Sequence, residues 1–157
     1  MPSLELNFTI EGEKQLLRRL QGVSENLKDW RPEFKKVGSG LLKTFKDNFQ
    51  NQGRTLGMPW QRLKPSTLKE KIRLGYSGAG ILVRTGKMKR SFQSKPGHKQ
   101  VVISNPTSYF PYHQSNKSRN KLPRRVMMRI DNIRAQEIVK VFQSAVQEIL
   151  QGDKGVR

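Results

Sequence analysis

The chain has 157 residues, of which 34% are hydrophobic, with 31 Lys and Arg against 12 Asp and Glu and a formal net charge of +19. The length fits a single domain spanning residues 1–157, and the lack of cysteine excludes disulfides, zinc–thiolate sites and thiol nucleophiles. No apolar run approaches the ~20 residues of a membrane-spanning helix, and the first residues lack the basic start and apolar core of a secretory signal. We therefore expect neither a membrane segment nor a signal peptide.

The positive charge is concentrated in the middle of the chain. Residues 1–53 hold 9 basic and 7 acidic residues, and residues 131–157 hold 4 of each. Residues 54–130 hold 18 basic residues and one acid, Glu70. Because so many like charges repel one another in a compact protein, this basic central body is expected to face a negative partner, either nucleic acid or acidic protein.

The N-terminal third predicts a strand followed by two amphipathic helices. Apolar residues alternate from Leu4 to Ile10, which is typical of a short strand with one buried face. Apolar residues then recur at helical spacing over about 12–28, and a second helix is predicted from Pro32 to about residue 50. Gly38 and Gly40 lie within the second helix and would let another backbone come close.

The basic middle predicts short helices and a hairpin. Ser66 or Thr67 can cap a short helix that ends near Arg73, and Thr85 can cap another over residues 86–92. The stretch before the first of these helices, residues 51–63, is expected to be irregular. Two strands, roughly 92–95 and 99–104, are expected around a Pro96-Gly97 turn.

The C-terminal third ends in a long helix. Residues 109–114 are expected to be compact and aromatic, residues 115–121 a mobile loop, and residues 127–130 a short apolar stretch. Asn132 can cap an amphipathic helix over about 132–151, whose apolar face includes Ile138, Phe142 and Ile149. The fold class is therefore α+β, with an N-terminal strand, two amphipathic helices, a small antiparallel sheet with a hairpin near 92–104, and the C-terminal helix.

Catalytic and cofactor motifs are lacking in the sequence. Five residues separate Gly80 from Gly86 and Met88 follows Lys87, so the spacing of a phosphate-binding loop is not met. His98 and His113 are isolated from each other and from acids, which favours a solvent-facing His98 and a packed His113 over a metal site or a general base. We predict no enzymatic activity, no cofactor and no metal; a nuclease or toxin would need more acids and histidines.

Large aromatic residues lie in the basic middle, namely Trp60, Tyr109, Phe110 and Tyr112. Aromatic side chains beside basic ones can stack on nucleic-acid bases. The preferred interpretation is that these four fill the core, because the middle of the chain has few other large apolar groups.

Three groups of motifs resemble the Mu/P2-type phage virion morphogenesis, or tail completion, family. The first comprises Asn48-Phe49, residues 57–63 (GMPWQRL) and Thr67-Leu68-Lys69. The second is the string at residues 82–92, LVRTGKMKRSF. The third is residues 101–104 with Tyr112-His113-Gln114 and Pro123-Arg124. The sequence departs from the family pattern after Gln114, where Ser115-Asn116 replace a frequent glycine, and after Arg124, where Arg125-Val126 replace Pro-Phe.

The resemblance implies a structural protein of a tailed phage or prophage, located at the head–tail junction of the virion after assembly in the host cytoplasm. It would complete the tail or join it to the head connector as a homo-oligomeric ring, most simply a hexamer. Its partners would be the tail tube or its terminator and the connector, with packaged DNA as a further candidate and no membrane. The partner-binding residues implied are Arg84, Lys87, Arg90, His113, Arg124 and Arg125. The alternative is a sequence-nonspecific nucleic-acid-binding protein, which the charge alone would support.

Overall fold

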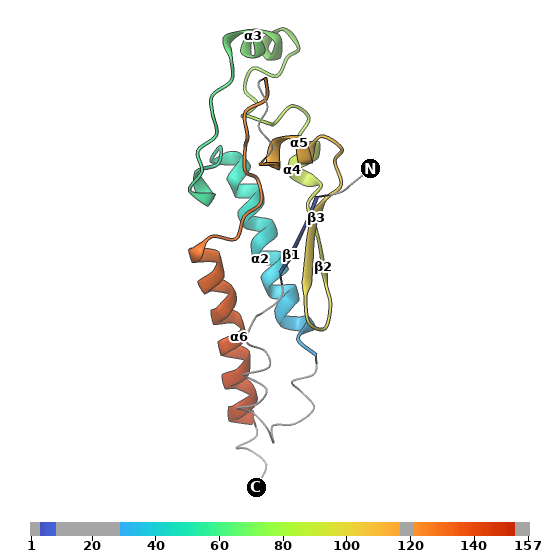
Figure 1. The fold of residues 1–157 in the computed structure, drawn as a ribbon, viewed down its shortest axis with the longest axis vertical. Coiled ribbons are helices and arrows are strands. Elements are labelled where there is room, and N and C mark those ends of the chain that lie inside the picture. The colour runs from blue at the N-terminus through green and yellow to red at the C-terminus, as the bar shows by residue number, and fades with distance from the viewer. Residues whose placement is uncertain (1–3, 9–28, 117–120, 153–157) are drawn as a thin grey trace. The chain divides into compact units, whose positions relative to one another are not determined.

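The computed structural model describes residues 4–8, 29–116 and 121–152, and the predicted helix over 12–28 lies outside them. The elements follow in the order β1 (Leu4–Phe8), α2 (Arg31–Gln50), the 3-10 turn η2 (Arg54–Leu56), α3 (Pro65–Arg73), α4 (Lys87–Arg90), β2 (Gln93–Pro96), β3 (Val101–Asn105), α5 (Phe110–Gln114) and α6 (Asn132–Gly152) (Figure 1). The strands form one sheet in the order β1-β3-β2. The α+β class, the hairpin and the long C-terminal helix are confirmed. The 3-10 turn adds one ordered element to a stretch predicted to be irregular.

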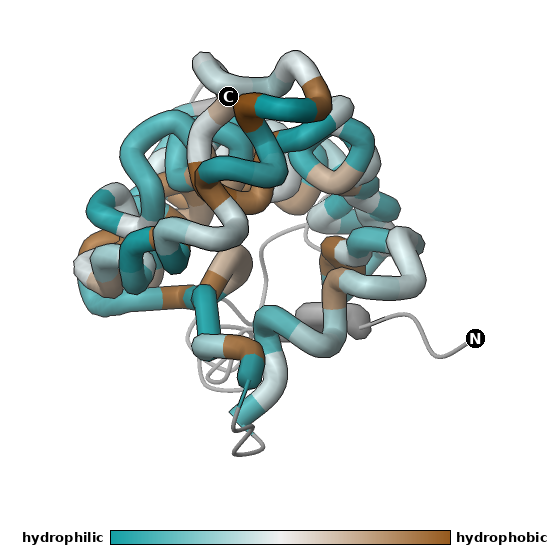
Figure 2. Tube along the Cα trace, turned by 90° about the horizontal axis from the view of Figure 1, so that it is seen from above, coloured by the Kyte–Doolittle hydropathy of each residue, from teal (hydrophilic) through white to brown (hydrophobic). Residues whose placement is uncertain are grey.

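The chain divides into two compact units, each with its own apolar interior. Of the described residues, unit 1 comprises 4–5, 42–93, 104–116 and 121–129, and unit 2 comprises 6–8, 29–41, 94–103 and 130–152. Hydrophobic residues recur singly or in short stretches between hydrophilic ones along the trace (Figure 2). Burial therefore depends on which face of each element points inward, as amphipathic elements require.

Unit 2 is held together by aromatic contacts between the start of α2 and the middle of α6. The ring of Phe142 lies 5.2 Å from that of Trp30 and 5.1 Å from that of Phe34, centroid to centroid. Ile138 and Ala145 are buried on the same side of α6, whereas Val139 is exposed. The predicted packing face of α6 is thus confirmed at Ile138 and Phe142, while Ile149 is only half-buried.

One glycine of α2 is required by the hairpin. A Cβ on Gly38 would collide with the Ser94 hydroxyl and would come within 3.2 Å of the Val101 side chain. The predicted approach of another backbone is therefore not found at Gly38, where side chains of the two strands come close instead. The same expectation is wrong for Gly40, because a Cβ there would meet nothing within 4 Å.

Unit 1 has an aromatic core. Phe92 lies 5.8 Å from Phe45, 6.0 Å from Phe49 and 5.7 Å from Phe110, and Phe49 lies 5.2 Å from Trp60. All five rings are buried. Tilted and edge-on aromatic pairs at such distances add to the free energy gained by burying their area.

The stretch of residues 122–130 has no regular secondary structure, yet Val126, Met127 and Met128 are buried. The Val126 carbonyl accepts hydrogen bonds from Asn48 Nδ2 at 3.1 Å and from Trp60 Nε1 at 2.9 Å. Gln114 Oε1 accepts from the amides of Met127 at 2.7 Å and Met128 at 3.1 Å, and its Nε2 donates to the Met128 carbonyl at 2.6 Å. Side chains thus supply the partners that buried backbone groups need.

Three predicted helix caps are wrong. Gly86, not Thr85, is the residue that caps α4, although Thr85 Oγ1 accepts the Lys87 amide at 3.4 Å. Lys64 precedes α3 without a side-chain cap, and Pro65 occupies the first turn of the helix. Proline is favourable there because the first N–H groups of a helix have no acceptor within the helix. Ser66 and Thr67 lie inside the helix. For α6 the side chain of Asp131, not Asn132, accepts the Arg134 amide at 2.9 Å. An aspartate there also complements the positive end of the helix dipole.

Candidate functional site

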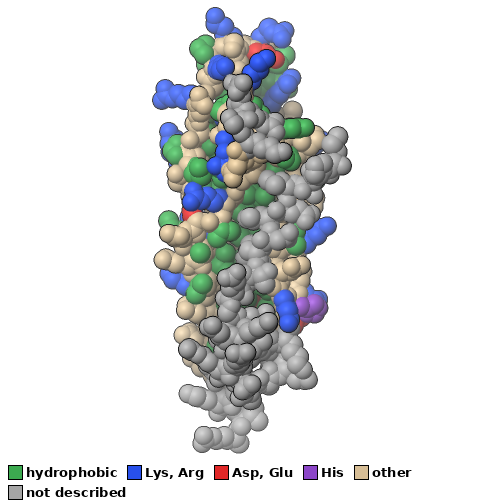
Figure 3. Space-filling model, viewed as in Figure 1, with side chains coloured by type: hydrophobic (Ala, Val, Ile, Leu, Met, Phe, Trp, Pro, Cys, Tyr) green, Lys and Arg blue, Asp and Glu red, His purple; other side chains and the backbone are tan. Residues whose placement is uncertain are grey.

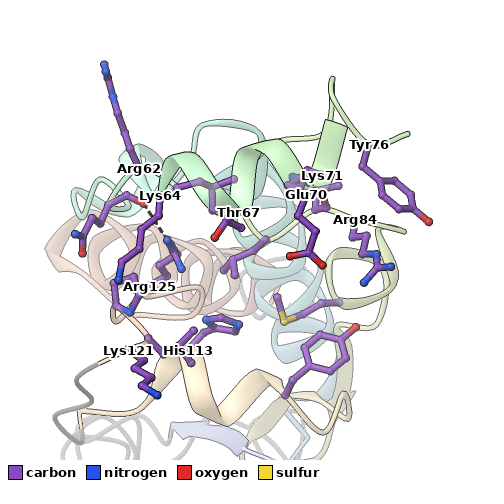
Figure 4. A pocket seen from close by; sticks show the side chains of 18 of the residues that line it. Arg62, Lys64, Thr67, Glu70, Lys71, Tyr76, Arg84, His113, Lys121 and Arg125 are labelled. Atoms are coloured by element: carbon purple, nitrogen blue, oxygen red, sulfur yellow. Dashed lines mark hydrogen bonds between the residues drawn. The ribbon is translucent and has the colours of Figure 1, made fainter. Parts of the chain in front are cut away.

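Unit 1 contains a cavity of about 480 Å³ beneath α3 (Figure 4). Its walls come from the segment that leads into α3, from α3 itself, from the following loop, and from the chain around α5 and residues 121–125. The lining comprises Gln61, Arg62, Leu63, Lys64, Thr67, Glu70, Lys71, Leu74, Tyr76, Leu82, Val83, Arg84, Met88, Tyr109, His113, Lys121, Leu122, Pro123 and Arg125. Six of these residues are Lys or Arg and one is an acid, so the lining is basic and partly apolar.

The cavity lies where basic side chains gather on the surface. Lys and Arg cluster over the part of unit 1 that contains α3, with hydrophobic side chains between them (Figure 3). In α3 no residue is buried, and Leu68 and Ile72 are exposed. The helix therefore acts as a thin wall over the cavity rather than as a core element.

Lys71 is the residue of α3 that fixes the loop behind it. Its Nζ donates to the carbonyl oxygens of Ala79 and Gly80 at 2.8 Å and of Val83 at 3.0 Å. These bonds use all three donors of an ammonium group. Burial lowers the pKa of Lys71. In the loop that Lys71 holds, Leu82 adopts a φ of 60°, which is uncommon for a residue with a side chain. The role of Lys71 is to close the loop, so it offers no free donor to a partner.

Arg125 is the buried cation of the cavity. Its side chain is 4% exposed, and its Nη2 donates to the Gln61 carbonyl at 3.1 Å. Its Nε is buried without a hydrogen-bond partner, and among the residues that the structure describes no carboxylate pairs with it. Burial lowers the pKa of Arg125, yet a guanidinium keeps its charge at neutral pH. A positive charge is thus held in the wall of the cavity with one neutral acceptor.

The structure brings together three of the six predicted partner-binding residues. Arg84, His113 and Arg125 line the cavity. The Arg84 guanidinium lies 5.3 Å from the centre of the Tyr76 ring, and the His113 carbonyl accepts the Arg125 amide at 2.9 Å. His113 is half-buried, which agrees with the packed position predicted for it.

The other three predicted residues are exposed outside the cavity. Lys87 and Arg90 lie on α4, and Arg90 Nη2 donates to the Thr85 carbonyl at 2.9 Å. Arg124 Nε donates to the Gln114 carbonyl at 3.3 Å. Backbone oxygens accept hydrogen bonds from both guanidinium groups, which leaves further N–H groups of each free to face an anion.

Sequence reasoning missed Lys64, Lys71 and Lys121 as cavity residues. Figure 4 shows Lys64 descending from the start of α3 on the side of the cavity where Arg125 lies, whereas Arg62 extends away from it. Nothing in the sequence separates these lysines from their neighbours. Only the turn of the chain after α3 and the approach of residues 121–125 bring them to one cavity.

The aromatic prediction is half right. Trp60 and Phe110 are buried as expected, but Tyr109 is 41% and Tyr112 is 51% exposed. The reason is that α5 is a single helical turn with room for one large ring on its buried side, and that ring is Phe110. Tyr109 instead lines the cavity.

His98 lies at the exposed turn of the hairpin in unit 2, as predicted. Its Nδ1 lies 3.1 Å from the Asp29 carboxylate, and Arg31 contacts the same ring. The amide of Arg31 donates to Asp29 Oδ1 and is the main cause that lowers the pKa of Asp29. No group of three or more His, Cys, Asp or Glu side chains within the described ranges could hold a metal ion.

The comparison with protein families identifies the chain's relatives. The model of the phage virion morphogenesis family matches residues 12–147. No curated protein and no protein of known structure shows significant similarity to the chain. Among the described helices none is both long and apolar enough to cross a membrane. The match covers most of the sequence and includes all three groups of resembling motifs, so the chain belongs to the phage virion morphogenesis family and has a structural or assembly role in a phage virion.

Proposed function

We propose that this protein completes the phage tail or joins it to the head connector at the neck, and that it does so as a homo-oligomeric ring. The observation that carries the proposal is the unmatched charge of the basic central body. Residues 54–130 hold 18 basic residues and one acid, and within the described part of the chain Arg90 and Arg124 bond backbone oxygens instead of carboxylates. A surface of this kind is suited to an acidic face of a neighbouring virion protein.

A ring requires each copy to use two different surfaces. A heterologous contact that closes on itself generates a ring, and the same contact that fails to close generates a filament. A closed ring on the last ring of the tail tube would stop its growth and present a new face to the head. The exposed cations Arg84, Lys87, Arg90 and Arg124 are the proposed contacts with the neighbours.

The proposal predicts that single charge reversals impair assembly. Arg84→Glu, Arg90→Glu and Arg124→Glu are each expected to lower the yield of infectious particles at least tenfold. Reversal breaks a pair that the assembled interface buries, which costs ~3–5 kcal/mol, against ~0–1 kcal/mol for a pair left in water. The measurement is complementation of a phage that lacks the gene, with Lys43→Glu as the control, since Lys43 is exposed on α2 and lies outside the motifs. Normal yields from all three reversals would refute these contacts.

A second candidate function is sequence-nonspecific nucleic-acid binding, which the exposed Tyr109 and Tyr112 favour because they lie among the surplus cations. Many phosphates would then share the binding, so single reversals would have little effect. Affinity would fall steeply and smoothly with salt. Normal assembly by every reversal, together with tight DNA binding and a steep salt slope, would replace the first proposal with this one.

We also propose that the protein works without catalysis. His98 belongs to unit 2 and His113 to unit 1, and the lining of the cavity offers one acid, Glu70. Nuclease and phosphatase assays, with and without Mg²⁺ or Mn²⁺, are expected to give no turnover above background. Turnover that His113→Ala abolishes would contradict this expectation.

A further inference from the structure

We propose that the cavity of unit 1 is a receptor for an acidic segment of a neighbouring protein, with Arg125 as the residue that binds one of its carboxylates. The identity of the neighbour as a virion protein rests on the proposed function. The binding of a carboxylate rests only on the cavity itself.

The first support is the condition of Arg125. A charge taken out of water is costly unless it is paired and its hydrogen-bonding groups are satisfied. Arg125 is 4% exposed, bonds one neutral carbonyl oxygen and leaves its Nε without a partner. A carboxylate in the cavity would supply the missing negative charge and an acceptor for Nε in the paired geometry that guanidinium groups favour. The site is therefore incomplete in the free chain.

The second support is the rest of the lining. The volume of about 480 Å³ falls within the range of ~300–1,000 Å³ that is typical of ligand-binding pockets. Leu63, Leu82, Met88 and Leu122 supply apolar surface on which the stem of an amino-acid side chain can pack. Lys64, Lys121 and Arg84 surround the cavity and can attract further acidic residues of the same segment. Lys71 takes no part, because its three donors hold the loop.

The lining favours a peptide carboxylate over a nucleic-acid strand. Single-strand binders present an open groove with free aromatic faces for successive bases. Here the Arg84 guanidinium lies 5.3 Å from the centre of the Tyr76 ring, and Tyr109 is the one exposed aromatic residue of the lining, too few for a row of stacked bases. One buried guanidinium in a partly apolar pocket suits a single carboxylate with aliphatic neighbours.

The test uses the purified full-length protein and a hexaglutamate peptide as the probe, measured by isothermal titration at 50 mM NaCl. Wild type is expected to bind hexaglutamate and to show no binding of hexaglutamine. Arg125→Met is expected to weaken binding at least tenfold. Arg129→Met removes an equal charge from an exposed position of unit 1 outside the cavity, and it is expected to change the affinity less than twofold.

A thermal melt of each variant shows whether it is folded, and so distinguishes a loss of binding from a loss of structure. Because a buried charge without a carboxylate is replaced by an apolar chain of similar length, Arg125→Met is expected to melt at or above the wild-type temperature. Hexaglutamate should raise the melting temperature of wild type and of Arg129→Met but not that of Arg125→Met. A measurement on unmodified protein needs no variant: the NMR signal of the Arg125 Nε–H should move when hexaglutamate is added.

Several outcomes would overturn the proposal. These are no binding of hexaglutamate by wild type, equal binding by Arg125→Met, and an Arg125 Nε–H signal that stays unmoved. Tighter Arg125-dependent binding of a dT12 oligonucleotide would assign the cavity to nucleic acid, and equal affinity for inorganic phosphate would reduce it to a simple anion site. Arg90 and Arg124 lie outside the cavity, so the assembly assay with Arg90→Glu and Arg124→Glu is separate from this test, and either proposal can fail while the other stands.

Discussion

Phe142→Ala is expected to lower the free energy of unfolding by about 3–5 kcal/mol, as truncation of a buried phenylalanine generally does. Phe142 is 8% exposed, and its ring contacts Trp30 and Phe34 of the same unit at centroid distances of 5.2 and 5.1 Å. Truncation removes both ring contacts and leaves a cavity that the two helices cannot fill by small movements. Urea unfolding followed by circular dichroism measures the change.

The control for this variant lies on the same helix. Val139 is 51% exposed, so Val139→Ala should alter the free energy of unfolding by no more than about 0.5 kcal/mol. An unchanged unfolding midpoint for Phe142→Ala would mean that the apolar stripe of α6 stabilises an interface with another molecule instead of unit 2.

The second large effect is expected from Asn48→Ala, with a loss of about 2–4 kcal/mol. Asn48 is fully buried; its Nδ2 donates to the Val126 carbonyl, and its Oδ1 accepts the Leu56 amide at 3.3 Å. Alanine leaves the Leu56 N–H buried without an acceptor, and an unsatisfied buried group costs more than the hydrogen bond itself contributed. The Val126 carbonyl keeps the bond from Trp60 Nε1, which limits the loss.

Asn51→Ala is the matched control. Asn51 is exposed three residues later, and its Nδ2 donates to Thr55 Oγ1 at 2.9 Å in contact with water. Its removal should cost no more than about 0.5 kcal/mol because water replaces the lost partner. Equal destabilisation by the two variants in thermal or urea unfolding would disprove the special role assigned to Asn48.

Long periodic elements could be predicted from the sequence, and local end effects could not. The apolar spacing from Phe34 to Phe49 and from Ile138 to Ala145 is enough to place α2 and α6, since each helix has one face that must be buried. The cap predictions failed because α3 begins at Pro65 after an uncapped Lys64, and because Asp131 instead of the adjacent Asn132 accepts an amide at the start of α6. A sequence pattern does not decide which of two adjacent polar residues leaves the helix. The loop predicted over 115–121 lies partly outside the described residues.

The candidate site could be predicted only as a region of charge. Arg124 and Arg125 are chemically the same and adjacent in sequence, yet the first is exposed and the second is buried. The difference arises because Arg125 pairs its amide with His113 and its side chain with Gln61, two residues remote in sequence. In the same way Lys69 and Lys71 are chemically identical residues of α3, and only the hydrogen bonds to the following loop distinguish Lys71. Contacts of this kind join residues that are remote in sequence, so they produce no periodic pattern from which they could be predicted.

The buried stretch around Val126 has a consequence for how the sequence can evolve. Asn48, Trp60 and Gln114, all remote in sequence, supply the side-chain partners of its backbone, so its own side chains need only fill space. Val126, Met127 and Met128 can therefore drift among apolar residues of similar volume with little penalty. Asn48 and Gln114 cannot change alone, because loss of either side chain leaves buried backbone amides without an acceptor, whereas the Val126 carbonyl keeps the Asn48 donor if Trp60 changes. Selection would thus act on positions far from the segment whose path they determine.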